Sequence, residues 1–147
     1  MTGKSLLQRL HRTSGRERAD FAEALVALVA ASAAIKLLPF RAVVRTMSYG
    51  GGGSGHGSAD QQVIEVQRAV KRAAARLPWT IVCFPEGLAV HWMLRRRGAP
   101  SQVHYGLRQS QSALTAHVWV TLAGAVVVGE EIDDRHICVA VFPPAPS

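Results

Sequence analysis

A cysteine at residue 83 is the first candidate for chemistry in this sequence. Cys83 lies where a short apolar piece, 80–82, gives way to a segment with helical character. A thiol at the start of a helix faces the positive end of the helix dipole and the unpaired amides of the first turn, and both favour the thiolate. The same amides can stabilise the oxyanion formed when a thiolate attacks an acyl carbonyl. The alternative is that Cys83 is a small buried hydrophobe.

A histidine at residue 117 is the second candidate. His117 interrupts a run, 115–120, whose residues strongly prefer a strand. On a strand, this side chain faces either the core or a cleft. In a cleft, its imidazole would accept the thiol proton as a general base and would itself be oriented by a third group. The alternative is a partly buried histidine whose hydrogen bonds are satisfied.

The position of the third group follows from a tight turn that Ala123-Gly124 predicts. Counting back along both strands from this turn places His117 opposite Glu130. Because cross-strand neighbours have Cβ atoms about 5 Å apart, Glu130 would reach the imidazole and hold its tautomer. A slip of one residue would bring a neighbour of Glu130 opposite and change the face. Asp133 and Asp134, just past the strand, are the fallback candidates.

Other side chains of chemically useful types occupy weaker positions. Trp79 either lines a substrate groove or packs in the core. His91 lies two turns beyond Cys83, which is too far for the base role at a rise of about 1.5 Å per residue. Cys138, in an alternating strand, is expected to pack. No Cys and His cluster has the spacing of a structural zinc site, so we expect no metal and no other cofactor.

Composition and charge narrow the possible functions. The chain has 147 residues, of which 48% are hydrophobic, and 17 Lys and Arg against 10 Asp and Glu give a net charge of +7. This suits one folded domain and argues against disorder. Two cysteines fit a reducing cytoplasm. The charge is compatible with nucleic acid, a membrane surface or an acidic partner, but no run interleaves basic and aromatic residues, which argues against nucleic acid. The apolar stretch 24–35 is too short for stable membrane insertion.

The first third of the chain predicts helices and a linker. Strong helix formers fill 21–45, where Asp20 can act as the cap and Pro39 should divide the run into a helix and a short second helix. The basic stretch 4–18 suits a surface helix or a docking arm. Six of the eight residues in 50–57 are Gly, which predicts flexibility. We therefore divide the chain into a helical region (1–49), a Gly-rich linker (50–58) and a core domain (59–147).

The core domain changes period along its length. Ser58 or Asp60 should open a helix through Arg76, and a central helix should run from about Phe84 to Gly98. Four segments rich in Val then read as strands: 101–108, 114–122, 125–130 and 137–142. Helices followed by an antiparallel sheet predict an α+β fold, with the nucleophile at the start of the central helix that packs on the sheet.

A combination of short motifs carries a family resemblance: Leu37-Leu38-Pro39-Phe40-Arg41, Leu77-Pro78-Trp79, Cys83-Phe84-Pro85, Leu88-Ala89, Leu94-Arg95-Arg96-Arg97-Gly98 and Ala116-His117-Val118-Trp119-Val120. Together they resemble the transglutaminase-like B2 proteins of lasso peptide biosynthesis. Members of that family are papain-like cysteine peptidases with a Cys-His-Asp type triad. They remove the leader from a precursor peptide, so that a separate ATP-dependent macrocyclase can close the isopeptide ring.

The resemblance implies roles for residues and for partners. It makes Cys83 the nucleophile and His117 the general base. The chain has no room for a leader-binding domain beyond its N-terminal helices, so the resemblance implies a separate leader-binding recognition protein, with the basic N-terminal arm and helix as the docking surface. Glu86 and Gly87 stand where the family has a basic and a small residue, and the acid would oppose the thiolate unless it turned away. No Asp occupies the third triad position, where Glu130 is the nearest acid.

Two alternatives use the same residues differently. In the first, an amine rather than water resolves the thioester, as in a true transglutaminase. In the second, the triad is broken, and the chain is a scaffold that binds a precursor or a partner through its basic helices.

Overall fold

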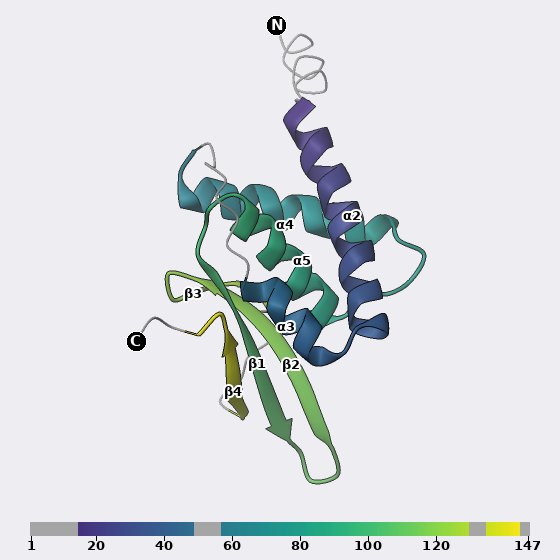
Figure 1. Ribbon diagram of the computed structural model, residues 1–147, viewed down its shortest axis with the longest axis vertical. Helices are drawn as coiled ribbons and strands as arrows, with labels where there is room; N and C mark the ends of the chain where they lie inside the picture. Colours follow the sequence, from purple (N-terminus) through teal and green to yellow (C-terminus); the bar gives the residue numbers. More distant parts are fainter. Residues whose placement is uncertain (1–14, 49–56, 130–134, 145–147) are drawn as a thin grey trace, which may run out of the picture.

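The computed structural model describes residues 15–48, 57–129 and 135–144. Within these ranges, four helices precede an antiparallel sheet of four strands (Figure 1). The helices are α2 (Gly15–Leu37), α3 (Phe40–Ser48), α4 (Ala59–Arg76) and α5 (Cys83–Arg96), and the strands are β1 (Ser101–Gln109), β2 (Leu114–Leu122), β3 (Ala125–Val128) and β4 (His136–Phe142). The predicted α+β order is confirmed.

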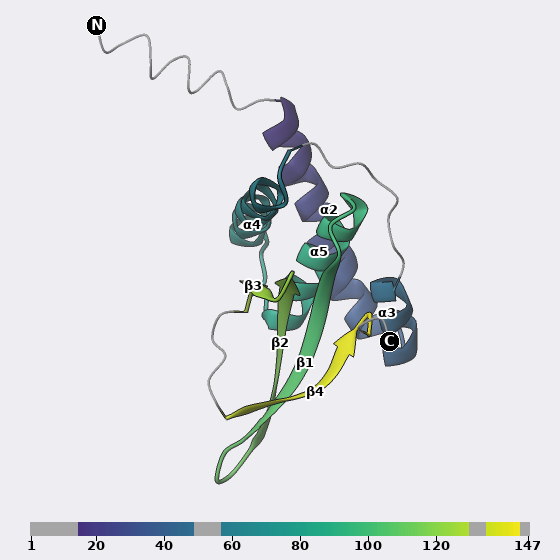
Figure 2. The ribbon, with the colours of Figure 1, turned by 90° about the vertical axis from the view of Figure 1, so that its left-hand side faces the viewer.

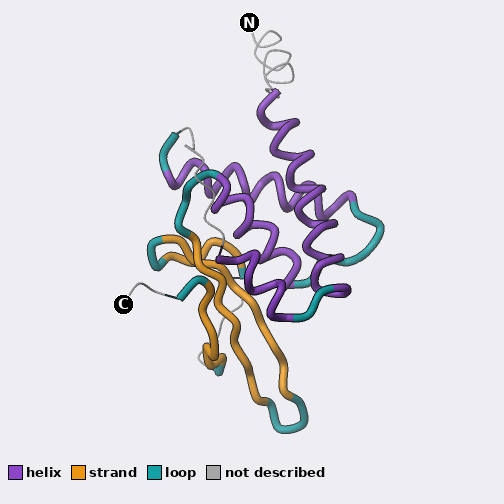
Figure 3. Tube along the Cα trace, viewed as in Figure 1, coloured by secondary structure: helices purple, strands orange, loops and turns teal. Residues whose placement is uncertain are grey.

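The helices form one layer and the sheet another (Figures 2 and 3). The strand order is β3-β2-β1-β4, with antiparallel pairing throughout. α5 lies directly on β2, because Gly87 has no side chain to hold them apart. A Cβ at Gly87 would lie 3.0 Å from Val118 Cγ1 and 3.5 Å from Val120 Cγ2. The start of α5, and with it Cys83, is thereby positioned against the sheet.

The helix boundaries follow local chemistry with one exception. α2 ends at Leu37 and α3 begins at Phe40, so the predicted break at Pro39 is confirmed. Ser58 caps α4, since its hydroxyl accepts a hydrogen bond from the Gln61 amide at 3.3 Å. Asp20 is not a cap. It lies inside α2, which already begins by Gly15.

The Asp20 carboxylate instead helps to fix the far end of α5. The Arg97 guanidinium, just past that end, donates to Asp20 Oδ1 at 2.7 Å and to both oxygens of Glu23 at 3.0 and 3.1 Å. All three side chains are at least four-fifths buried. Gly98 then turns the chain towards β1 with φ of +78°. These contacts bind α5 to α2.

The middle of α5 is held by a buried histidine. His91 is fully buried, its Nε2–H donates to the Met47 carbonyl of α3 at 2.9 Å, and its Nδ1 accepts from the Ser101 hydroxyl of β1 at 2.8 Å. Burial lowers the pKa of His91 to about 4, against the opposing effect of the hydrogen bond to Met47. His91 is therefore neutral at pH 7 and joins three elements.

None of the described helices combines the length and the apolar character that crossing a membrane would require. Most of the predicted linker, and most of the basic stretch 4–18, lie outside the described residues.

Candidate active site

Cys83 is the first residue of α5, one position earlier than the sequence predicts for the helix start. The preceding residue, Val82, is extended and provides no side-chain cap. The first helical hydrogen bond at this end runs from the Glu86 amide to the Val82 carbonyl, and Pro85 has no N–H. The amides of Cys83 and Phe84 are therefore outside the helical ladder and are available at the thiol.

A cavity of about 380 Å³ opens beside this helix start. It lies between α4, the first two turns of α5 and the neighbouring strands β2 and β3. Its lining residues are Gln67, Val70, Lys71, Cys83, Glu86, Val90, His117, Val127, Val128 and Gly129. The structure thus brings the predicted nucleophile and the predicted base, which are 34 positions apart in the sequence, to one cavity.

The His117 ring is oriented by a backbone carbonyl and by neighbouring rings. Its Nε2 lies 3.3 Å from the Gly129 carbonyl oxygen, which can only accept, so Nε2 carries the proton and donates. In the neutral ring, Nδ1 is then the nitrogen without a proton. The ring stacks on Trp119, with ring centroids 6.1 Å apart, and lies beside the His136 ring, with ring centroids 5.3 Å apart. This arrangement leaves Nδ1 as the atom that can accept a proton.

The hairpin that presents Gly129 departs from the predicted register. Its turn is as predicted, with positive φ at both Ala123 and Gly124. Thr121 still pairs with Val126, as predicted. The register then shifts by one residue, and Val120 pairs with Val128 instead of the predicted Val127. The inserted residue makes a β-bulge, and the predicted pairing is wrong beyond it.

The strand also ends earlier than predicted. β3 stops at Val128, and Gly129 adopts φ of +85° against the next strand, where a Cβ would lie 2.7 Å from Trp119 Cβ. Glu130, Asp133 and Asp134 lie outside the described residues. The role of Glu130 as third triad member therefore stays a prediction.

A family comparison covers both candidate catalytic residues. The model of the transglutaminase-like superfamily matches residues 25–139. The chain belongs to the transglutaminase-like superfamily. Superfamilies of this kind contain enzymes of the cysteine peptidase and acyltransferase types. No curated protein and no solved structure matches the chain significantly.

Glu86 gives this transglutaminase-like cavity an unusual acid. It lies three positions after Cys83 on α5 and lines the same cavity, so its side chain does not turn away from the site. Burial raises the pKa of Glu86, and the Lys71 ammonium on α4 partly opposes this. A raised pKa increases the neutral fraction of the carboxyl, and a neutral carboxyl does not repel a thiolate. The repulsion between Glu86 and the Cys83 thiolate that the sequence predicts is thereby reduced.

Trp79 lies in the loop before α5, is 43% exposed and is not among the residues that line the cavity. Its role in substrate binding stays a prediction.

Cys138 is exposed, so its predicted packing role is wrong. Its sulfur lies 3.8 Å from His104 Nδ1 on the neighbouring strand. No group of three or more metal-ligating side chains gathers within the described part of the chain.

Two further residues of this transglutaminase-like site escaped sequence reasoning. Gln67 of α4 donates a hydrogen bond from its Nε2 to the Val127 carbonyl, which fastens the helix to the bulge. Gly129 supplies the carbonyl that orients the imidazole. A glutamine on a helix gives no signal of such a contact. Gly129 gives a weak signal, because a glycine in a strand pattern often marks a break or a bulge.

Proposed function

We propose that this protein is the cysteine peptidase that removes the leader from a lasso peptide precursor. One observation carries the proposal most directly. Cys83, at a helix start without a cap, shares a cavity with His117, whose Nδ1 is the unprotonated nitrogen. Membership of the transglutaminase-like superfamily and the resemblance of the combined motifs to B2 proteins support the same assignment.

The first half of the reaction forms a thioester. His117 Nδ1 takes the proton from the Cys83 thiol, and Sγ attacks the carbonyl carbon of the scissile peptide bond. The carbonyl oxygen becomes an oxyanion, which the free amides of Cys83 and Phe84 stabilise. The imidazolium returns its proton to the leaving amine as the C–N bond breaks. The core peptide departs with a free N-terminus, and the leader remains bound to sulfur as a thioester.

The second half releases the leader. His117 Nδ1 takes a proton from a water molecule, whose oxygen attacks the thioester carbonyl. The C–S bond then breaks, the sulfur regains a proton from the imidazolium, and the leader leaves as a carboxylic acid. Throughout both halves the Gly129 carbonyl accepts a hydrogen bond from Nε2–H and stabilises the positive charge that forms on the ring. As third member of the triad, Glu130 would stabilise the same positive charge with its carboxylate.

The proposal includes partners. A separate leader-binding recognition protein delivers the precursor, and an ATP-dependent macrocyclase uses the free N-terminus of the core. Both follow from the resemblance to B2 proteins. The cavity itself contains space for a short peptide stretch at the thiol, with about 380 Å³ available.

A processing assay tests the proposal. The precursor peptide and the leader-binding protein from the same gene neighbourhood are incubated with the protein, and the products are read by mass spectrometry. We expect cleavage at one bond that disappears in Cys83→Ala and in His117→Ala. Cys138→Ala is the matched control for Cys83→Ala, because Cys138 lies on the sheet and does not line the cavity. Cleavage that survives Cys83→Ala would refute the mechanism.

The same assay separates the alternatives. Hydrolysis in H₂¹⁸O labels the new leader carboxylate, whereas acyl transfer to an added primary amine gives a leader amide. A scaffold would bind precursor equally as wild type and as Cys83→Ala, and would cleave in neither form. The Glu130→Gln variant reports the third position. A loss of kcat with unchanged KM would assign Glu130 to the triad, and an unchanged kcat would leave the Gly129 carbonyl alone in that role.

A further inference from the structure

The outward face of α2 is apolar over most of its length. Its exposed positions between Ala19 and Leu37 are alanines, valines and one leucine apart from Lys36. Val26 is 69% exposed and Val29 is 45% exposed. A helix that is apolar on all sides is normally buried, and the inward face of α2 already packs on α4 and α5. Within the described part of the chain nothing covers the outward face, which has the character of a contact surface.

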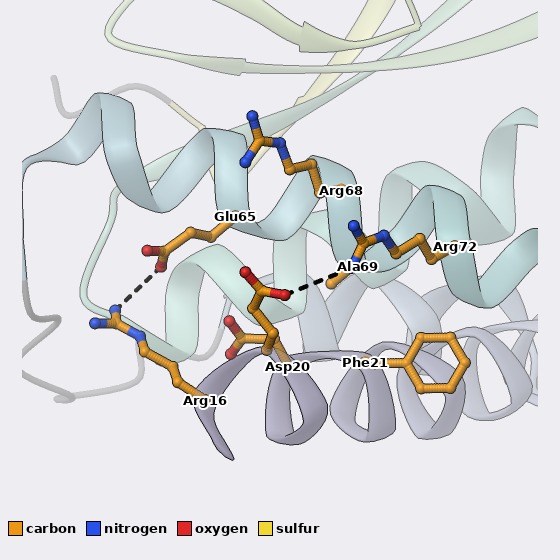
Figure 4. Close-up of a pocket in the computed structure, with 8 residues that line it drawn as sticks. Arg16, Asp20, Phe21, Glu65, Arg68, Ala69 and Arg72 are labelled. Carbon is orange, nitrogen blue, oxygen red and sulfur yellow. Dashed lines mark hydrogen bonds and ion pairs between the residues drawn. The ribbon is translucent and has the colours of Figure 1, made fainter. Parts of the chain in front are cut away.

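This apolar face continues into a basic groove. Arg18 lies on the same side of α2 as Ala22, Val26 and Val29, at spacings of one to three turns. Arg18 also lines a groove between α2 and α4, together with Glu17 and Phe21 and, from α4, Arg72, Ala75 and Arg76. The groove thus holds three arginines and one acid. The neighbouring pocket in Figure 4 shares Glu17, Phe21 and Arg72, and its three arginines are matched by three acids.

The charges of this groove are incompletely balanced inside the protein. Glu65 pairs with Arg16 (Figure 4), with the closest atoms 3.1 Å apart, and a Glu17 oxygen lies 3.7 Å from an Arg72 nitrogen. The remaining acids of α2, Asp20 and Glu23, bind the Arg97 guanidinium just past the end of α5. Among the described residues, Arg18, Arg68 and Arg76 form no ion pair, and all three are exposed. The groove consequently presents net positive charge beside the apolar face.

The arginines of α4 have a regular spacing. Arg68, Arg72 and Arg76 stand four positions apart, which places successive guanidinium groups about 6 Å apart along the axis. A second helix with acidic residues four positions apart would match this spacing. Its apolar side would cover Val26 and Val29 at the same time. The apolar face of α2 and the arginines of α4 therefore fit one ligand.

We infer that the α2–α4 surface, defined as Ala22, Val26 and Val29 with Arg18, Arg72 and Arg76, docks an acidic amphipathic helix of a partner protein. A second copy of this chain fits poorly, because it would bring the same arginines against this surface. The inference does not rest on the peptidase activity, since the surface shares no residue with the lining of the thiol cavity.

Binding to a designed probe tests the inference. The probe is a fluorescein-labelled helical peptide of about 20 residues with Leu on one face and Glu on the other, and its control has Lys in place of Glu. Fluorescence anisotropy is measured with the full chain carrying Cys83→Ala. We expect the Glu peptide alone to bind, with an affinity that falls as NaCl is raised. Absence of binding, or equal binding of the Lys peptide, would overturn the inference.

Matched variants locate the binding. Val26→Glu and Arg76→Glu should each weaken binding about tenfold. Ile137→Glu on β4 is the control for the first, because Ile137 is also 69% exposed, and Arg41→Glu on α3 is the control for the second. Equal effects of test and control variants would refute the assignment. Sedimentation velocity tests self-association. A dimer that Val26→Glu converts to a monomer would assign the surface to a second copy of this chain and would overturn the inference. Thermal melts confirm that all four variants are folded.

Discussion

Acid should destabilise this protein through His91, the buried histidine that joins α3, α5 and β1. Protonation would place a charge in the core and would require Nδ1 to donate where it now accepts from the Ser101 hydroxyl. Burial is the main cause of the lowered pKa, with the Arg95 guanidinium acting in the same direction and the hydrogen bond to Met47 against it. Since the folded-state pKa is below the unfolded value, the neutral ring contributes stability above pH 6.5. That contribution is lost as the pH falls towards the folded-state pKa.

The magnitude follows from the two pKa values. A change from 6.5 unfolded to about 4 folded corresponds to about 3 kcal/mol at most, at roughly 1.4 kcal/mol per pH unit. Between pH 7 and pH 4.5, about 2 kcal/mol of this should be lost. No discount for solvent screening applies, because the side chain is fully buried. This is a large fraction of the unfolding free energy of an ordinary domain.

Urea unfolding followed by circular dichroism measures the effect. The comparison is between wild type and His91→Gln at several pH values from 7 to 4.5. The amide of glutamine can still donate to the Met47 carbonyl but does not titrate. Other titratable groups are common to both proteins, and their contributions cancel in the difference. The wild type should lose about 2 kcal/mol more than the variant. Parallel pH profiles would refute the assignment.

Three further predictions concern single positions. Gly129→Ala should lower kcat/KM of processing about tenfold or more, because the new Cβ would overlap β2 and displace the carbonyl that orients the base, whereas Gly124→Ala, also at positive φ but in open space, should not. Arg97→Met should cost about 3 kcal/mol in urea unfolding, because Asp20 loses its guanidinium partner and Glu23 keeps only the Arg96 Nε at 3.5 Å, while Arg96→Met removes only that exposed pair and should cost little. Ser58→Ala should lower stability by about 1 kcal/mol through loss of the α4 cap.

Much of the fold was predictable because strong local signals mark its boundaries. Pro39 cannot continue a helix, Gly98 readily adopts positive φ, and Ala123-Gly124 suits a tight turn. The alternation of Val-rich segments gave the strands to within two residues. That Cys83 and His117 line one cavity was predictable only by combining these signals with the family resemblance, because no local pattern encodes the proximity of residues 34 positions apart.

The remainder depends on contacts between distant segments. The bulge at Val127 is stabilised by Gln67 from α4, and no pattern within the hairpin reveals it. Asp20 has the residue type of a helix cap, but its tertiary partner Arg97 overrides that preference. Cys138 looked apolar by its strand pattern. Cys138 is exposed on β4, which is an edge strand of the sheet.

Unequal anchoring of the two candidate catalytic residues has a kinetic consequence. Cys83 begins a helix that is fixed at its middle and at its far end, so the amide protons that are hydrogen-bonded within α5 should exchange only through global opening. His117 depends on the carbonyl that follows β3, an edge strand of four residues. Such a short edge opens at low cost in free energy. Mild denaturant should therefore disassemble the site while the helices persist, and inactivation should precede any loss of ellipticity at 222 nm, the usual helix signal.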